Sequence, residues 1–169
     1  MTQEEIITKA VLKAISEIEQ NTEGIVSKSE AVASDKMTLD IAKKLIEKIE
    51  AKAKEWDMKV VAAVSDESGK IVAVHCMDGA YHGSYDVAVN KCFTATAFQM
   101  PTSKLADLCK PGSELYGLQF SNNGKVMILG GGVPLYSQGN MIGALGVSGS
   151  TAAKDTALSE YGQEIFSTI

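Results

Sequence analysis

The stretch MKVVAAVSDESGKIVAVHCM, residues 58–77, constrains the fold most. Apolar and β-branched residues run through 59–65 and again through 70–76, and the polar residues Asp66 to Gly69 separate them. Two such runs joined by a short segment with a glycine are typical of a β-hairpin. The chain is therefore expected to contain an antiparallel sheet that begins with these two strands.

Helical spacing of apolar residues predicts helices on either side of the hairpin. Thr38 can cap a helix whose apolar residues recur down to Trp56, and residues 84–100 are apolar nearly all round, as in a buried helix. A short helix is expected over Lys104–Cys109, capped by Thr102 or Ser103. A last helix is opened by Ser150 or Thr151, with Asp155 near its polar face.

Strand patterns return in the second half of the chain. KVMIL (125–129), GGGVPLY (130–136) and NMIGALGVSG (140–149) read as strands, with a tight turn at 138–140 between the last two. Three strands join the first two. The sequence therefore predicts an α+β domain in which an antiparallel sheet of about five strands packs against helices.

Composition excludes several classes of protein. A chain of 169 residues can fill one ordinary core, and its net charge of −5 comes from scattered residues, so a nucleic-acid partner is not expected. No run of 18 apolar residues and no signal-peptide pattern is present, so we expect no membrane attachment and a cytoplasmic location. Cys76, Cys92 and Cys109 fit neither a zinc ribbon nor a disulfide framework and are interpreted as small buried hydrophobic residues.

Three regions are predicted along the chain: an amphipathic helix at 1–20, a flexible linker at 21–36 and a folded domain at 37–169. The linker is rich in serine and charge and has no apolar period. The helix carries one apolar stripe, formed by Ile7, Val11, Ala14 and Ile18. Because an isolated helix of this length is marginal in water, the stripe is expected to dock on something.

The strings MDGAYHGSYDVAVNKCFTATAFQMPTSKLADL, LYGLQ and GGGVPLYSQGNMIGALGVSGSTAAKD resemble the GlcG/HbpS-like family. This family, also described as the haem-degrading domain family, includes the C-terminal domain of PduO adenosyltransferases. The resemblance covers roughly residues 39–165. It implies a PAS/profilin-like fold, assembly into homo-oligomers from dimers to octamers, and binding of haem, a corrinoid or another tetrapyrrole.

Two departures from the family pattern matter for function. The family often has an arginine just before the Met-Asp-Gly-Ala string, whereas here His75 and Cys76 precede it, so an anion contact by that arginine is not expected and a candidate metal ligand takes its place. The adenosyltransferase domain of PduO proteins would not fit into the 38 residues before the resemblance. We therefore do not expect corrinoid adenosyltransferase activity.

The two histidines are candidate axial ligands for haem iron, for which one imidazole suffices. His75 lies near a strand end and His82 just before a long helix, so both imidazoles could face one cleft; otherwise they are an ordinary strand residue and a surface residue. Asp78 can cap the following helix, hold its own loop or contact the ligand. Lys91 must snorkel, pair with a carboxylate or face a pocket, where it could meet a propionate or phosphate.

The glycine-rich corner completes the predicted site. Gly131 and Gly132 bring the backbone close to a ligand or a neighbouring chain, or else form a bulge or tight corner between strands. Thr102 belongs to the family-like Pro-Thr pair and is a further candidate for ligand binding. No nucleophile with its base is evident, and GALGVSGS has the elements of a nucleophile elbow in the wrong order.

The sequence thus predicts an oligomeric small-molecule binding protein, with haem or a related tetrapyrrole as the first ligand to test. Two alternatives stay open: an enzyme of haem degradation or of a diol, glycolate or aldehyde pathway, and a scaffold without ligand. Residues 1–20 resemble the encapsulation peptides of bacterial microcompartments, whose gene clusters also hold family members. The resemblance implies shell proteins as partners and the microcompartment lumen as a location.

Overall fold

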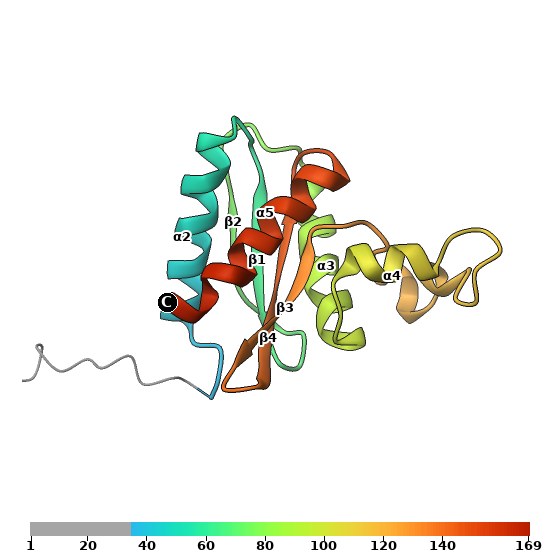
Figure 1. Ribbon diagram of the computed structural model, residues 1–169. Coiled ribbons are helices and arrows are strands. Elements are labelled where there is room, and N and C mark those ends of the chain that lie inside the picture. Colours follow the sequence, from blue (N-terminus) through green and yellow to red (C-terminus); the bar gives the residue numbers. More distant parts are fainter. Residues whose placement is uncertain (1–34) are drawn as a thin grey trace, which may run out of the picture. The chain divides into compact units, whose positions relative to one another are not determined.

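A computed structural model describes residues 35–169, so the predicted N-terminal helix and nearly all of the predicted linker lie outside the described residues. The described chain is an α+β domain built on one antiparallel sheet of four strands, in the order β2-β1-β4-β3 (Figure 1). The elements are α2 (Leu39–Glu55), β1 (Val61–Asp66), β2 (Ile71–Cys76), α3 (Ser84–Phe98), α4 (Thr102–Leu108), the 3-10 turns η1 (Leu118–Phe120) and η2 (Asn122–Gly124), β3 (Gly132–Ser137), β4 (Asn140–Ser148), α5 (Ala152–Ile165) and the 3-10 turn η3 (Phe166–Thr168).

The predicted hairpin is β1 and β2, paired in antiparallel register. Its turn is held by Asp66, whose Oδ1 accepts hydrogen bonds from the backbone N–H groups of Ser68 at 2.9 Å and Lys70 at 3.0 Å. Gly69 takes the positive φ of +80° that the turn requires. Local side-chain chemistry therefore closes the hairpin where the sequence predicts it.

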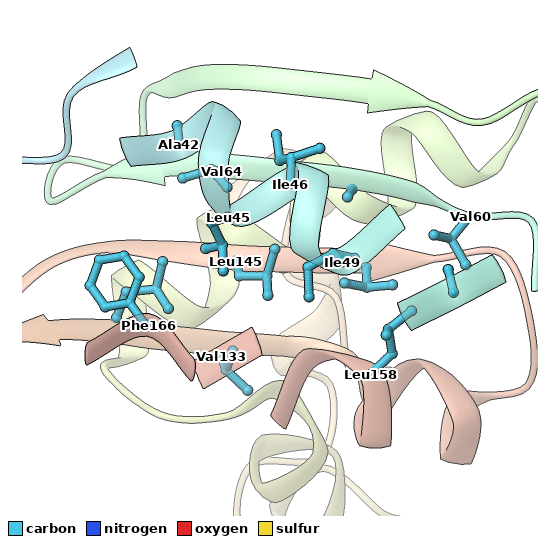
Figure 2. Close-up of a cluster of buried hydrophobic side chains, with 14 of the residues drawn as sticks. Ala42, Leu45, Ile46, Ile49, Val60, Val64, Val133, Leu145, Leu158 and Phe166 are labelled. Carbon is cyan, nitrogen blue, oxygen red and sulfur yellow. The ribbon is translucent and has the colours of Figure 1, made fainter. Parts of the chain in front are cut away.

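Helices cover both faces of the sheet. On one face α2 and α5 enclose the main core, drawn in Figure 2, while α3 packs on the other face. The side chains of strand β1 point alternately to the two faces of the sheet. Ala62 and Val64 pack on the α2 side, and Val61 and Ala63 pack on the α3 side. Thr38 caps α2 as predicted, its Oγ1 accepting from the N–H of Ile41 at 3.2 Å.

The main core joins residues of α2, the sheet and the C-terminal helical segment. Its larger buried members include Leu45, Ile46, Ile49, Val60, Val64, Val133, Leu135, Leu145, Leu158 and Phe166. Gly162 of α5 lets the helix lie close to this core, since a Cβ there would come within 2.5 Å of Leu145. The last helix begins after Thr151, whose Oγ1 accepts from the N–H of Lys154, as predicted.

The expectation of about five strands is wrong for the described chain, which has four, because residues 125–129 are not a strand. The N–H of Met127 donates to the side-chain Oγ1 of Thr94 on α3 at 2.8 Å instead of to a neighbouring strand. Val126 packs with Leu105 and Cys109 in a separate small cluster beside α4. A short apolar run can be buried in this way without joining a sheet, and periodicity alone does not distinguish the two.

Three smaller expectations also need correction. Neither Thr102 nor Ser103 caps the short helix, because α4 begins at Thr102 and Pro101 is its N-cap residue. Cys92 and Cys109 are buried as predicted, but Cys76 is exposed. None of the described helices is long and apolar enough to cross a bilayer.

Candidate functional site

Lys91 on α3 is fully buried and pairs with a carboxylate, one of the three arrangements foreseen for it. Its Nζ donates to the backbone oxygen of Val147 at 2.7 Å and to Oδ2 of Asp155 on α5 at 3.0 Å. Lys91 is 1% exposed and Asp155 3% exposed. Burial lowers the pKa of Lys91, and the charge of Asp155 and its hydrogen bond oppose that shift.

The glycine-rich corner packs directly against this ion pair. Gly131 has φ +117°, and a Cβ there would lie 2.7 Å from Nζ of Lys91 and 2.6 Å from the oxygen of Val147. A Cβ on Gly132 would lie 2.6 Å from Cγ2 of Thr102. The close backbone approach predicted from the glycines is therefore an approach to the chain's own side chains and backbone.

Thr102 ties the same corner to α4. Its Oγ1 donates to the oxygen of Leu129 at 2.7 Å and accepts from the N–H of Gly132 at 2.9 Å. The structure thus brings together four of the predicted site residues in what we call the Lys91 cluster, consisting of Lys91, Thr102, Gly131, Gly132 and Asp155.

Asp155 is the member of the cluster that the sequence prediction missed. It was expected near the polar face of its helix, and that is wrong, because both its oxygens are engaged in the interior. Oδ1 accepts from the N–H of Ser150 at 3.0 Å while Oδ2 pairs with Lys91. The available signal was Lys91 itself, since a lysine in an apolar helix requires a buried partner.

The two histidines are in different surroundings. His75 on β2 lies on the α2 side of the sheet, where its Nδ1 contacts Oε1 of Glu50 at 2.8 Å. Because a carboxylate only accepts, Nδ1 carries the proton in this contact. His82 is exposed in the turn before α3, and no contact joins the two imidazoles in residues 35–169. The structure therefore does not bring the histidines together.

A surface groove of about 420 Å³ lies where the C-terminal end of α2 meets the end of β2. We call it the α2–β2 groove; it is lined by Glu50, Lys54, Asp57, Met58, Lys59, Cys76, Met77 and Asp78. Asp78 is thus the predicted site residue that lines it, and His75 adjoins it through Glu50. Capping of the following helix, one of the roles left open for Asp78, does not occur, because α3 has no side-chain cap.

Lys59 crosses the turn that follows β2. A Cβ on Gly79 would lie 3.2 Å from Nζ of Lys59, and Gly79 has φ +80°. Glycine at position 79 therefore allows the positive φ of the turn and also leaves room for the side chain of Lys59. Lys54 and Lys59 form no ion pair with any residue in 35–169, so two free ammonium groups line the groove beside three carboxylates.

No group of three or more His, Cys, Asp or Glu side chains within the described range could hold a bare metal ion. A metal that brings most of its own ligands, as iron in haem does, needs only one or two donors from the protein. Near the groove the described chain offers the part-buried imidazole of His75 and the exposed thiol of Cys76, whereas the thioether of Met58 is buried in the main core.

Comparisons with known proteins agree with this fold. Residues 37–164 match the family model of haem degrading HbpS-like proteins. An uncharacterized 15.0 kDa protein from the dhaT-dhaS intergenic region of Citrobacter freundii is 39% identical over 143 residues, which are 85% of this chain and 99% of that protein. The corrinoid adenosyltransferase PduO of Salmonella typhimurium is 34% identical over 109 residues, which are 64% of this chain but 32% of PduO.

Two solved structures have the same fold. The Klebsiella pneumoniae protein ORFY superposes with a TM-score of 0.76 at 34% identity, covering 79% of this chain and 92% of that one. A complex of PduOC with haem superposes with a TM-score of 0.73 at 29% identity, covering 76% of this chain and 94% of that one.

Proposed function

Because the chain belongs to the family of haem degrading HbpS-like proteins, we propose that it binds haem or a related tetrapyrrole and acts as a small-molecule binding protein. The observation that carries the proposal is the likeness to the PduOC–haem complex over nearly the whole of that chain. Corrinoid adenosyltransferase activity is not proposed, since the chain spans about a third of PduO.

The residues around the α2–β2 groove fit such a ligand. Its volume of about 420 Å³ falls within the range of ~300–1,000 Å³ usual for small-molecule sites. Met58 and Met77 supply apolar wall, and the unpaired ammonium groups of Lys54 and Lys59 suit the carboxylates of a porphyrin. Bound haem would supply iron, whose remaining coordination positions accept protein donors.

His75 is held as metal-binding histidines usually are. The contact with Glu50 fixes the ring and its tautomer and leaves Nε2 as the nitrogen with a free lone pair. His82 is exposed and lacks such a partner in the described chain. Both histidines remain candidate axial ligands, and His75 is the better oriented of the two.

Titration of the full chain with haem tests this proposal. We expect a saturable Soret band in the wild-type protein, and weaker binding by roughly tenfold or more in His75→Ala or His82→Ala if that ring binds iron. Glu50→Gln, which keeps the size of the side chain but removes its charge, is the control for ring orientation. A parallel titration with cobalamin separates haem from corrinoids. A wild-type spectrum unchanged by either ligand would contradict the proposal.

Homo-oligomerisation is the second element of the proposal. The segment between α3 and β3, which extends away from the sheet in Figure 1, exposes several large apolar side chains: Leu108, Tyr116, Phe120 and Leu129. Exposed apolar residues on one segment are typical of surfaces that associate. Light scattering of the full chain at micromolar concentration should give a mass of two to eight protomers, and a monomer would contradict this element.

The third element concerns residues 1–20, for which the support is the amphipathic pattern of the sequence. We propose that they bind shell proteins and direct the chain into a bacterial microcompartment lumen. Fused to a fluorescent protein and co-expressed with shell proteins, residues 1–35 should give punctate fluorescence. Diffuse fluorescence without co-purification would contradict this element.

A further inference from the structure

The two edges of the sheet differ in how their backbone groups are used. The strand order β2-β1-β4-β3 makes β2 and β3 the edge strands. In an antiparallel sheet, every second residue of an edge strand directs its N–H and C=O groups away from the neighbouring strand. Because each backbone group needs a hydrogen-bond partner or water, the two edges can be compared residue by residue.

The β3 edge is closed by the chain itself. The hydrogen-bond pattern between β3 and β4 directs the backbone groups of Gly132 and Pro134 outward. The N–H of Gly132 donates to Oγ1 of Thr102 at 2.9 Å. Pro134 has no N–H, and its oxygen accepts from Nε2 of Gln163 at 2.6 Å. No outward donor of these two residues is left for another strand.

The β2 edge is open. The N–H of Met77 donates to the oxygen of Val60 at 3.0 Å, and alternation from this bond directs the N–H and C=O groups of Val74 and Cys76 away from β1. Within residues 35–169 no hydrogen bond from a loop, helix or side chain engages these outward groups. They are therefore available to a further strand.

Apolar side chains flank the open edge on both faces of the sheet. Val72 and Ala73 lie half-buried on the α2 side, and Ile71 and Val74 lie half-buried on the α3 side. Strand β2 contains no lysine, carboxylate or proline, the residues that usually keep an edge strand from pairing. A further strand at this edge would bury apolar surface as well as satisfy the backbone.

We propose that β2 pairs antiparallel with β2 of a second copy of this chain, across a two-fold axis at Val74, so that the two sheets continue into each other. The charge pattern of the segment KIVAVHCMD, residues 70–78, fits this partner. Pairing centred on Val74 brings Lys70 of each copy within reach of Asp78 of the other. Both residues are exposed, and neither forms an ion pair within residues 35–169.

The closed β3 edge decides which strand of the second copy is the partner. Pairing of β2 with β3 would repeat without closing, and β3 offers no donor for it, whereas pairing of β2 with β2 gives a closed two-fold dimer. A bulge opposite Val64 and Ser65 limits regular pairing to the C-terminal part of β2, where Val74 lies. The inference rests on the homo-oligomerisation element of the proposed function and gives it an interface.

Proline at position 74 tests the pairing. Val74→Pro removes the outward N–H at the two-fold axis and leaves the hydrogen bonds between β1 and β2 in place. We expect the mass of the full chain in light scattering to fall at least twofold. Val74→Thr keeps the N–H and the β-branched shape and should have the wild-type mass. Circular dichroism checks that both variants are folded.

Exchange of the two charges tests the register and does not depend on how proline is tolerated. Lys70→Glu places like charges at both ends of the interface, so the assembly should dissociate on dilution at a protein concentration roughly tenfold or more above that of wild type. Lys70→Glu combined with Asp78→Lys restores opposite charges and should return to within about threefold of wild type. If the double variant is no better than Lys70→Glu, the proposed register is wrong.

The outcomes separate the inference from the proposed function. A monomeric wild-type chain would overturn the inference together with homo-oligomerisation, and haem titration would still decide ligand binding. A wild-type oligomer whose mass is the same in folded Val74→Pro, or whose dissociation is the same in Lys70→Glu, would overturn the inference alone, because another surface would then hold the copies together. Loss of mass in Val74→Pro with rescue by the charge exchange would support it.

Discussion

The Lys91 cluster and the α2–β2 groove use the same kinds of charged residue in opposite ways. In the cluster every polar group is satisfied inside the protein, since Lys91 has two acceptors and each oxygen of Asp155 accepts a hydrogen bond. In the groove, Lys54 and Lys59 have no ion-pair partner within residues 35–169. Polar groups that satisfy one another hold a fold together, whereas unpaired polar groups in a hollow are available to a ligand.

The sequence strings that resemble the family fall into two groups, those that form the Lys91 cluster and those that lie at the α2–β2 groove. Two of these strings meet in the interior: one contains Lys91 and Thr102, and the other ends in Asp155. Lys91 and Asp155 pair there although they are 64 positions apart in the sequence. The Met-Asp-Gly-Ala string lies beside the groove, where Gly79 leaves room for Lys59. Similarity to a family therefore covers both residues that build the fold and residues that line a surface groove, and burial distinguishes the two groups.

Asp155→Ala should give the largest effect on stability. It leaves the ammonium of Lys91 buried without its counter-charge, which costs about 3–5 kcal/mol in the free energy of unfolding. Urea unfolding followed by circular dichroism measures the loss. Asp78→Ala, which removes an exposed carboxylate from the groove, should change stability by less than about 0.5 kcal/mol.

A double variant checks that the loss comes from the unpaired charge. Lys91→Met combined with Asp155→Leu removes both charges and should recover most of the stability, because apolar replacement of a buried ion pair is often neutral or stabilising. A loss below about 1 kcal/mol in Asp155→Ala would contradict the role given to the pair.

Gly131→Ala should give the next largest effect. The new Cβ would have to displace Lys91 or the backbone of Val147 and would hold alanine at φ +117°, so we expect a loss of about 3 kcal/mol from overpacking and strain together. Gly139→Ala is the matched control, since Gly139 also has a positive φ of +83° but nothing lies within 4 Å of its Cβ position.

The control variant should lose only about 1 kcal/mol, from backbone strain alone. Urea midpoints of the two alanine variants give the comparison directly. Equal losses would mean that close packing against the Lys91 cluster adds nothing to the requirement for glycine at 131.

Elements that depend on neighbours in sequence were predicted well. The hairpin follows from alternation and from the polar turn that Asp66 closes, and the caps at Thr38 and Thr151 follow from their side chains. The segment 125–129 was assigned wrongly because its burial depends on α4 and on Thr94, which no local pattern reveals.

The contacts among the predicted site residues were foreseen only in part, for the same reason. Lys91, Thr102, Gly131 and Gly132 do meet, but their missing partner is Asp155, which looked like an ordinary first-turn acid. The groove could not be predicted from the sequence, because Glu50, Lys54 and Lys59 belong to segments without any motif. Only the packing of α2 beside the end of β2 places them next to Asp78.

The smallest effect is expected in the groove itself, from Lys54→Gln combined with Lys59→Gln. Each exposed ion pair with a porphyrin carboxylate contributes about 0.2–1 kcal/mol, so the double variant should bind haem roughly 2- to 30-fold more weakly, with unchanged stability. Lys43→Gln with Lys44→Gln is the matched control, because these lysines lie on α2, the helix that also carries Lys54, but do not line the groove.

Haem dimethyl ester, which lacks free carboxylates, shows whether the lysines act through charge. The ester should bind wild type and the Lys54/Lys59 variant equally, and added salt should narrow the difference seen with haem. If the variant instead binds haem and its ester equally weakly, the lysines act through the shape of the groove and not through their charge. That result would contradict the idea that the unpaired ammonium groups of the groove are available to a ligand, while the account of the Lys91 cluster would stand.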